Sequence, residues 1–230
     1  MRCGTFALTG SVLAMGASWA LAALPFVNRN VTAPIAFAVA VEELTEHQQD
    51  VRQVLQSPTV AARGPSETFA CRPEHYFHFL DHPDEAVRAW RKLGAKCVGI
   101  SNLGGGQFGW SDELGSEVTW KTIYRDPGKR VWYAHGKVKP NHLLPMVPVK
   151  VVVVLHHTEK KTDGEATGIE HHAEVFLHTD SRAAALLART MGSSTTRVAE
   201  QGLGQLQLFF SALCYYLDQN PQRAAMVMGR

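Results

Sequence analysis

The chain has 230 residues, of which 45% are hydrophobic and 19% are charged, and its formal net charge at pH 7 is +2. This length and composition suit one ordinary domain with a sizeable core. A charge this balanced excludes the strong positive field with which proteins hold a nucleic-acid backbone, so nucleic acid is not an expected partner.

The first 23 residues have the pattern of a targeting segment. Met1-Arg2 precedes an apolar block that ends at Ala23, and Ala20-Leu21-Ala22 supplies small residues for cleavage. We expect residues 1–23 to be a signal peptide for a periplasmic or secreted protein. If the block is not cleaved, it is instead an N-terminal membrane anchor.

Residues 24–66 have the composition of a linker with one short helix. Apolar positions between Glu42 and Leu55 indicate that helix, and the breaker cluster Arg63-Gly64-Pro65-Ser66 indicates a boundary near residue 66. The compact domain is therefore expected over residues 67–220, followed by a tail at 221–230.

A helical hairpin is expected at the start of this domain. Pro73 precedes a helical run that ends before Asp81-His82-Pro83, and a second run ends at Gly94. A short strand is then expected over residues 96–102.

The middle of the domain predicts a β-hairpin over residues 118–125 and 130–138. Its turn, Asp126-Pro127-Gly128-Lys129, contains the proline and glycine that a chain reversal favours. Pairing about this turn is expected to set Trp120 opposite His135 and Tyr124 opposite Val131, with Tyr133 on the same aromatic face.

A second hairpin, over residues 149–157 and 167–178, leads into a long helix expected over residues 181–217. Leu206, Phe209 and Leu213 recur on this helix at the spacing of a buried stripe. The expected fold class is therefore α+β, with antiparallel strands followed by a long C-terminal helix.

This order of elements, over about residues 67–217, resembles the helix-grip fold of the START-like superfamily, also called SRPBCC or Bet v 1-like proteins. The resemblance implies a curved antiparallel sheet wrapped around the long C-terminal helix, with a cavity between them that takes lipids or other hydrophobic molecules. The first hypothesis is therefore an exported protein that binds or transfers such a molecule, with contact to a membrane surface as a further expectation and with no cofactor. The candidate lining residues are Trp120, Tyr124, Tyr133, His135, Leu206, Phe209 and Leu213.

The alternative is an enzyme of the same fold, a cyclase or hydrolase in which His135 acts as acid or base because its unperturbed pKa lies near neutrality. The chain lacks the Cys and His spacing of Rieske oxygenases. The Gly-x-Ser-x-Gly motif, which positions the nucleophilic serine of many hydrolases, is also absent from the sequence.

Paired histidines on the second hairpin suggest a metal site as another form of the enzyme hypothesis. If residue 156 pairs with residue 171, then His157, Glu170 and His172 gather on one face, with ligands that suit zinc or copper. The competing interpretation is a coincidental pair of half-exposed strand histidines, because no standard ligand spacing is present and a slip of one residue would separate the set.

Cleavage would remove Cys3 and leave three cysteines. Either Cys71 and Cys97 form a disulfide in an oxidising compartment, or Cys71, Cys97 and Cys214 are all buried, reduced thiols.

Overall fold

The computed structural model describes residues 47–139, 142–143, 145–161, 167–182 and 194–227. The predicted signal peptide or anchor, most of the predicted linker and the first turns of the predicted last helix lie outside this part of the chain. In chain order the elements are α1 (Gln48–Gln56), β1 (Val60–Arg63), β2 (Glu67–Ala70), α2 (Pro73–Asp81), α3 (Pro83–Lys92), β3 (Ser101–Gly104), β4 (Gln107–Ser111), β5 (Glu117–Asp126), β6 (Lys129–Val138), β7 (Val147–Lys161), β8 (Thr167–His178), α5 (Ser194–Gln219) and α6 (Pro221–Val227).

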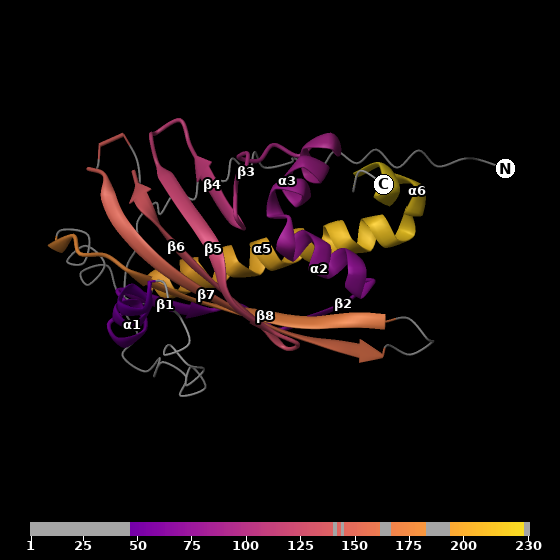
Figure 1. Ribbon diagram of the computed structural model, residues 1–230, viewed down its shortest axis with the longest axis horizontal. Coiled ribbons are helices and arrows are strands. Elements are labelled where there is room, and N and C mark those ends of the chain that lie inside the picture. Colours follow the sequence, from indigo (N-terminus) through magenta and orange to yellow (C-terminus); the bar gives the residue numbers. More distant parts are fainter. Residues whose placement is uncertain (1–46, 140–141, 144, 162–166, 183–193, 228–230) are drawn as a thin grey trace.

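The strands form one antiparallel sheet of eight strands in the order β1-β8-β7-β6-β5-β4-β3, and β2 also pairs with β8. The long helix α5 runs along one side of this curved sheet (Figure 1). Helices α2 and α3 lie beside the second half of α5, whereas α1 lies at the other end of the sheet. The predicted α+β class, an antiparallel sheet with a long C-terminal helix, is confirmed. Of the described helices, none is long and apolar enough to cross a membrane.

The two faces of the sheet carry separate cores, because neighbouring strand residues point to opposite faces. On the inner face, defined here as the face toward α2 and α5, Ile169 and Ala173 of β8 pack with Tyr76, Leu213 and Leu217. A second cluster lies on the outer face under α1. Its buried members are Val51, Val54, Leu55, Ala61, Val131, Tyr133, Val152, Val154 and Phe176.

The fold begins before the predicted boundary at residue 66. Strand β1 pairs with β8 from Val60 opposite Leu177 to Arg63 opposite Glu174. Within the predicted breaker cluster, the Gly64 amide donates a hydrogen bond of 2.8 Å to the Ala173 carbonyl. The sequence Val-Ala-Ala-Arg is too short and too small to signal a strand by itself, so only its distant partner β8 defines it. At the other end of the chain, the predicted tail contains helix α6.

The β5–β6 register differs in part from the prediction. Tyr124 lies opposite Val131 as expected, but an irregularity between Thr122 and Tyr124 shifts the rest of the pairing by one residue. Trp120 consequently faces Ala134 instead of His135. A bulge adds one residue to one strand and so reverses the faces of all residues beyond it.

The cysteines are arranged differently from the pairing considered above. Cys71, just after β2, contacts Cys214 of α5 inside the inner core, and both thiols are buried and unbonded. Cys97 lies elsewhere, with its sulfur 4.0 Å from the Val87 carbonyl oxygen. A Cys71–Cys97 disulfide is therefore not the arrangement of this fold.

Candidate functional site

Helix α5 covers only part of the inner face. Among the described residues, its contacts with the sheet are concentrated on β1, β2 and β8, at one edge. The inner face is more open along the middle of strand β7 than beside it, where inward-pointing Val149 and Leu155 are buried. Val152 and Val154, which point outward under α1, are 0% and 1% exposed, whereas Val151 and Val153, which point inward, are only half-buried.

The neighbouring strands repeat this contrast. Outward-pointing Tyr133 and Phe176 are each 2% exposed, but inward-pointing Trp132, Val175 and Leu177 beside them are half-buried. The inward-facing, partly exposed apolar residues form what we call the inner apolar surface. Its members are Trp110, Trp120, Trp132, Val151, Val153, Val175 and Leu177.

This surface has the composition of a binding site for an apolar molecule. Indole rings supply large contact areas, and β-branched valines on strands supply a stiff floor. The Trp120 ring lies 6.0 Å from that of buried Phe108, which supports it from β4. The burial of apolar area here would contribute roughly 25 cal/mol per Å² before the costs of association are subtracted.

The structure separates the strand residues that were predicted to line one cavity. Trp120 belongs to the inner apolar surface, whereas Tyr124, Tyr133 and His135 lie on the outer side of the sheet. The Tyr133 hydroxyl donates a 3.1 Å hydrogen bond to Asp50 of α1, so this residue holds the N-terminal helix in place.

The predicted helix residues also have different environments. Leu213 is fully buried in the inner core, Leu206 is 45% exposed, and Phe209 stacks on Trp90 of α3 with ring centroids 4.4 Å apart. A groove of about 710 Å³ lies next to this stacked pair, between α3, α5 and α6. Trp90, Leu93, Tyr215, Tyr216 and Arg223 are among the residues that line it.

A buried polar chain lies under α5 next to the apolar residues. The Tyr76 hydroxyl is 3.2 Å from His171 Nδ1, and the Ser211 hydroxyl donates a 2.8 Å hydrogen bond to Glu67. His171 Nε2 lies 3.6 Å from Glu67, too far for a hydrogen bond, and it has no other partner in the described part of the chain. Sequence reasoning singled out the histidine pair but gave no signal of this environment, which depends on α2 and α5.

Burial lowers the pKa of His171 to about 4, although Glu67 acts in the opposite direction. The ring is therefore neutral at pH 7. A neutral, 3% exposed imidazole that bonds to a tyrosine is well suited to holding α2 against β8. It is also a weak base.

The β7–β8 register places the paired histidines one residue away from the predicted alignment. His156 lies opposite His172, and His157 lies opposite His171. The predicted metal set is therefore wrong: His157 points inward, 5.2 Å from the Phe77 ring, whereas Glu170 and His172 point outward. The sequence could not fix this register, because a shift of one residue in the pairing changes which side chains share a face.

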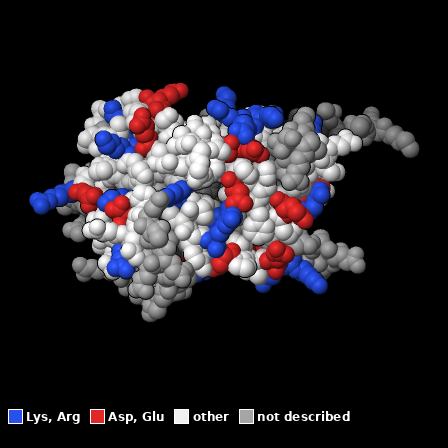
Figure 2. Space-filling model, viewed as in Figure 1, with Lys and Arg blue, Asp and Glu red and all other residues white. Residues whose placement is uncertain are grey.

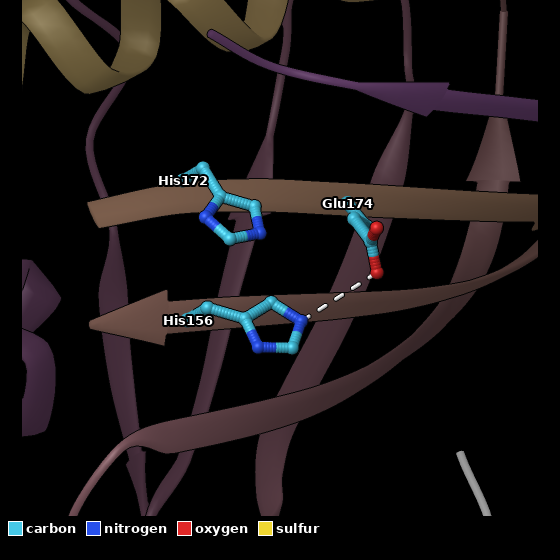
Figure 3. Close-up of side chains that lie close together, drawn as sticks. All are labelled: His156, His172 and Glu174. Atoms are coloured by element: carbon cyan, nitrogen blue, oxygen red, sulfur yellow. Dashed lines mark ion pairs between the residues drawn. The ribbon is translucent and has the colours of Figure 1, made fainter. Parts of the chain in front are cut away.

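The outward side of the same hairpin brings a different trio together. His156 of β7 lies beside His172 and Glu174 of β8, and all three side chains project from one face of adjacent strands (Figure 3). His156 Nε2 is 3.6 Å from a Glu174 carboxylate oxygen. The two imidazole rings stack with centroids 4.6 Å apart and an interplanar angle of 10°.

Charge on the molecular surface is mixed. Blue and red side chains are interspersed on the face drawn in Figure 2, with broad uncharged areas between them. This distribution agrees with the net charge of +2 and shows no broad basic region for a polyanion on that face.

Among known proteins, the chain is similar to solved structures but to no family model and no curated sequence. A conserved protein from Geobacillus kaustophilus is 12% identical with a TM-score of 0.44, over 70% of this chain and 96% of that one. Ara h 8.0201 is 16% identical with a TM-score of 0.39, over 70% and 99% of the two chains. The di-domain ARO/CYC BexL from the BE-7585A biosynthetic pathway is 13% identical with a TM-score of 0.39, over 73% of this chain and 52% of that one. Scores this low carry no argument about function, which must come from the residues of this chain.

Proposed function

We propose that this protein binds a hydrophobic, lipid-like small molecule on the inner apolar surface of its sheet. The observation that carries the proposal is the contrast between the two faces in the middle of β7, at residues 151–154. Residues that point toward the helical layer would be the most buried in a fully packed sheet and helix, yet Val151 and Val153 are more exposed than Val152 and Val154. Apolar surface left open on the inward side is typical of a ligand site.

Export and transfer at a membrane belong to the same proposal. The apolar block of residues 1–23 supports export, as argued from its sequence. Leu143 and Met146, in the connection between β6 and β7, are 95% and 40% exposed. Exposed apolar side chains in a loop favour brief contact with a bilayer, from which a carrier would collect its ligand.

The test uses a pair of arginine substitutions on one strand. Val151→Arg places a charge on the inner apolar surface, and Thr158→Arg places the same side chain at an exposed, outward position of β7. Titration with the uncharged dye N-phenyl-1-naphthylamine, monitored by quenching of tryptophan fluorescence, should show binding at least about tenfold weaker for Val151→Arg, because the ligand would bury an unpaired charge.

The Thr158→Arg protein should bind the dye as the parent does, and far-UV circular dichroism should show both variants folded. Native mass spectrometry of the parent, purified from its own host, should in addition detect a co-purifying apolar molecule. Equal dye affinity in parent and Val151→Arg would refute this site, because the arginine could not then lie in the binding surface.

The acid-base residue of the enzyme hypothesis, His135, does not lie on the inner apolar surface. His135 is exposed on the outer side of the sheet, with Nε2 3.4 Å from the Thr119 hydroxyl. Its distance across the sheet from the inner apolar surface prevents contact with a ligand bound there. Binding without chemistry is therefore the function that the geometry supports best.

A further inference from the structure

The outer face of the β7–β8 hairpin holds three metal-ligating side chains on a rigid support. His156, His172 and Glu174 each offer one donor atom, and these atoms lie within 4.8 Å of one another. The register fixes His156 directly opposite His172, and Glu174 lies two residues along β8, so its side chain points the same way.

We propose that His156, His172 and Glu174 bind a divalent transition-metal ion of the zinc and copper class. Two imidazole nitrogens and one carboxylate oxygen form a borderline donor set that suits these ions and disfavours magnesium and calcium, which prefer oxygen ligands. Three protein ligands leave a fourth position for water. This site is independent of the proposed ligand site, because it lies on the opposite face of the sheet.

The distances require a modest contraction around the ion. In a tetrahedral site with bonds of roughly 2.0–2.2 Å, donor atoms lie about 3.4 Å apart. His156 Nε2 and Glu174 Oε2 are already 3.6 Å apart. Rotation of the histidine side chains, which are half-buried and project from the sheet, can supply the remaining approach without movement of the strands.

Arg63 of β1 shows where the ion would lie. Its Nη2 donates a 3.0 Å hydrogen bond to His172 Nε2, and its Nη1 is 3.9 Å from a Glu174 oxygen. The guanidinium thus lies beside two of the three proposed ligands, where it would compete with a bound cation. Because His172 Nε2 accepts this bond, its proton is on Nδ1, and the ring has the tautomer that a metal at Nε2 requires. The Arg63 side chain is 62% exposed and can turn into solvent.

Zinc titration of the untagged, metal-stripped full chain tests the proposal. Isothermal calorimetry should give one zinc ion per chain and, in separate scans, zinc should raise the midpoint of thermal unfolding, because the ion binds the folded state preferentially. His172→Ala and Glu174→Gln should each weaken binding at least tenfold. Arg63→Ser should strengthen it severalfold, because a competing cation is removed.

The control is His142→Ala, which deletes an exposed imidazole outside the trio and should leave zinc affinity unchanged. Far-UV circular dichroism of each variant separates lost binding from lost folding. Affinity that is the same in parent, His172→Ala and Arg63→Ser would place zinc elsewhere and overturn the proposal. Absence of binding in both the parent and Arg63→Ser would overturn it as well.

Discussion

Acid should destabilise this fold through one buried histidine. His171 is 3% exposed, and burial holds its pKa at about 4, compared with 6.5 for a solvated histidine. Between these two pH values the unfolded chain binds a proton at this residue and the folded chain does not. The contribution of His171 to stability is therefore fully present above about pH 6.5, falls as the pH is lowered, and is lost below about pH 4.

The size of this effect follows from the two pKa values. Each pH unit between them costs about 1.4 kcal/mol, so the folded state should lose roughly 3 kcal/mol over the whole interval and roughly 2 kcal/mol by about pH 5. Such a loss is a large fraction of the 5–15 kcal/mol that stabilises a domain in general. Carboxylates add their own losses in acid, so the contribution of His171 must be isolated by difference.

His171→Phe provides that difference, because phenylalanine keeps the ring between Phe69 and Tyr76 but cannot titrate. Urea titrations at pH 7 and about pH 5 should show a smaller acid loss for this variant than for the parent, by roughly 2 kcal/mol. His142→Phe, at an exposed position, should keep the parental pH dependence. If His171→Phe loses as much stability in acid as the parent, then the imidazole is not held neutral by burial and the reasoning fails.

Two further predictions concern backbone space and thiol access. A Cβ at Gly136 would meet the Glu117 carbonyl oxygen and lie 2.7 Å from Val118 Cα, so Gly136→Ala should cost about 1–3 kcal/mol in urea unfolding. In contrast, a Cβ at Gly202 in α5 would meet nothing within 4 Å, so Gly202→Ala should stabilise the protein by up to about 1 kcal/mol. If Gly136→Ala were more stable than the parent, the close approach of β5 and β6 at this residue would be wrong. Maleimide labelling of the folded protein, mapped by peptide mass, should modify half-buried Cys97. It should not modify Cys71 and Cys214, because these residues are 1% and 0% exposed. The reverse pattern would refute the described core.

Local signals in the sequence were sufficient for most elements of the domain. Pro73 and Pro83 mark the first turns of α2 and α3, where a missing amide costs nothing, and Pro127-Gly128 marks the β5–β6 turn. The C-terminal helix followed from its apolar stripe. These features are encoded within a few residues of each other, so a pattern along the chain can reveal them.

Features that depend on distant partners were not accessible in this way. Strand β1 exists because β8 accepts its hydrogen bonds, and α1 is positioned by contacts such as the ion pair of 3.0 Å between Asp50 and Lys150. Predictions of which side chains share a face depended even more strongly on the exact strand register. A one-residue error in register exchanges the faces of a strand, so the bulge near Ile123 separated Trp120 from Tyr124, and the β7–β8 alignment exchanged His157 for His156 in the outer trio.

The N-terminal helix explains how the sheet can leave part of its inner face open. By burying Val51 and Val54 against Val152, Val154 and Phe176, α1 builds a second core on the side that many sheets leave in water. That core supplies stability without help from α5, which can then remain near β1, β2 and β8. Apolar area buried in this outer core adds to the stability of the folded state, and that contribution does not depend on how completely the inner face is packed. The segment that has the composition of a linker is thus part of the folded domain and contributes one of its two cores.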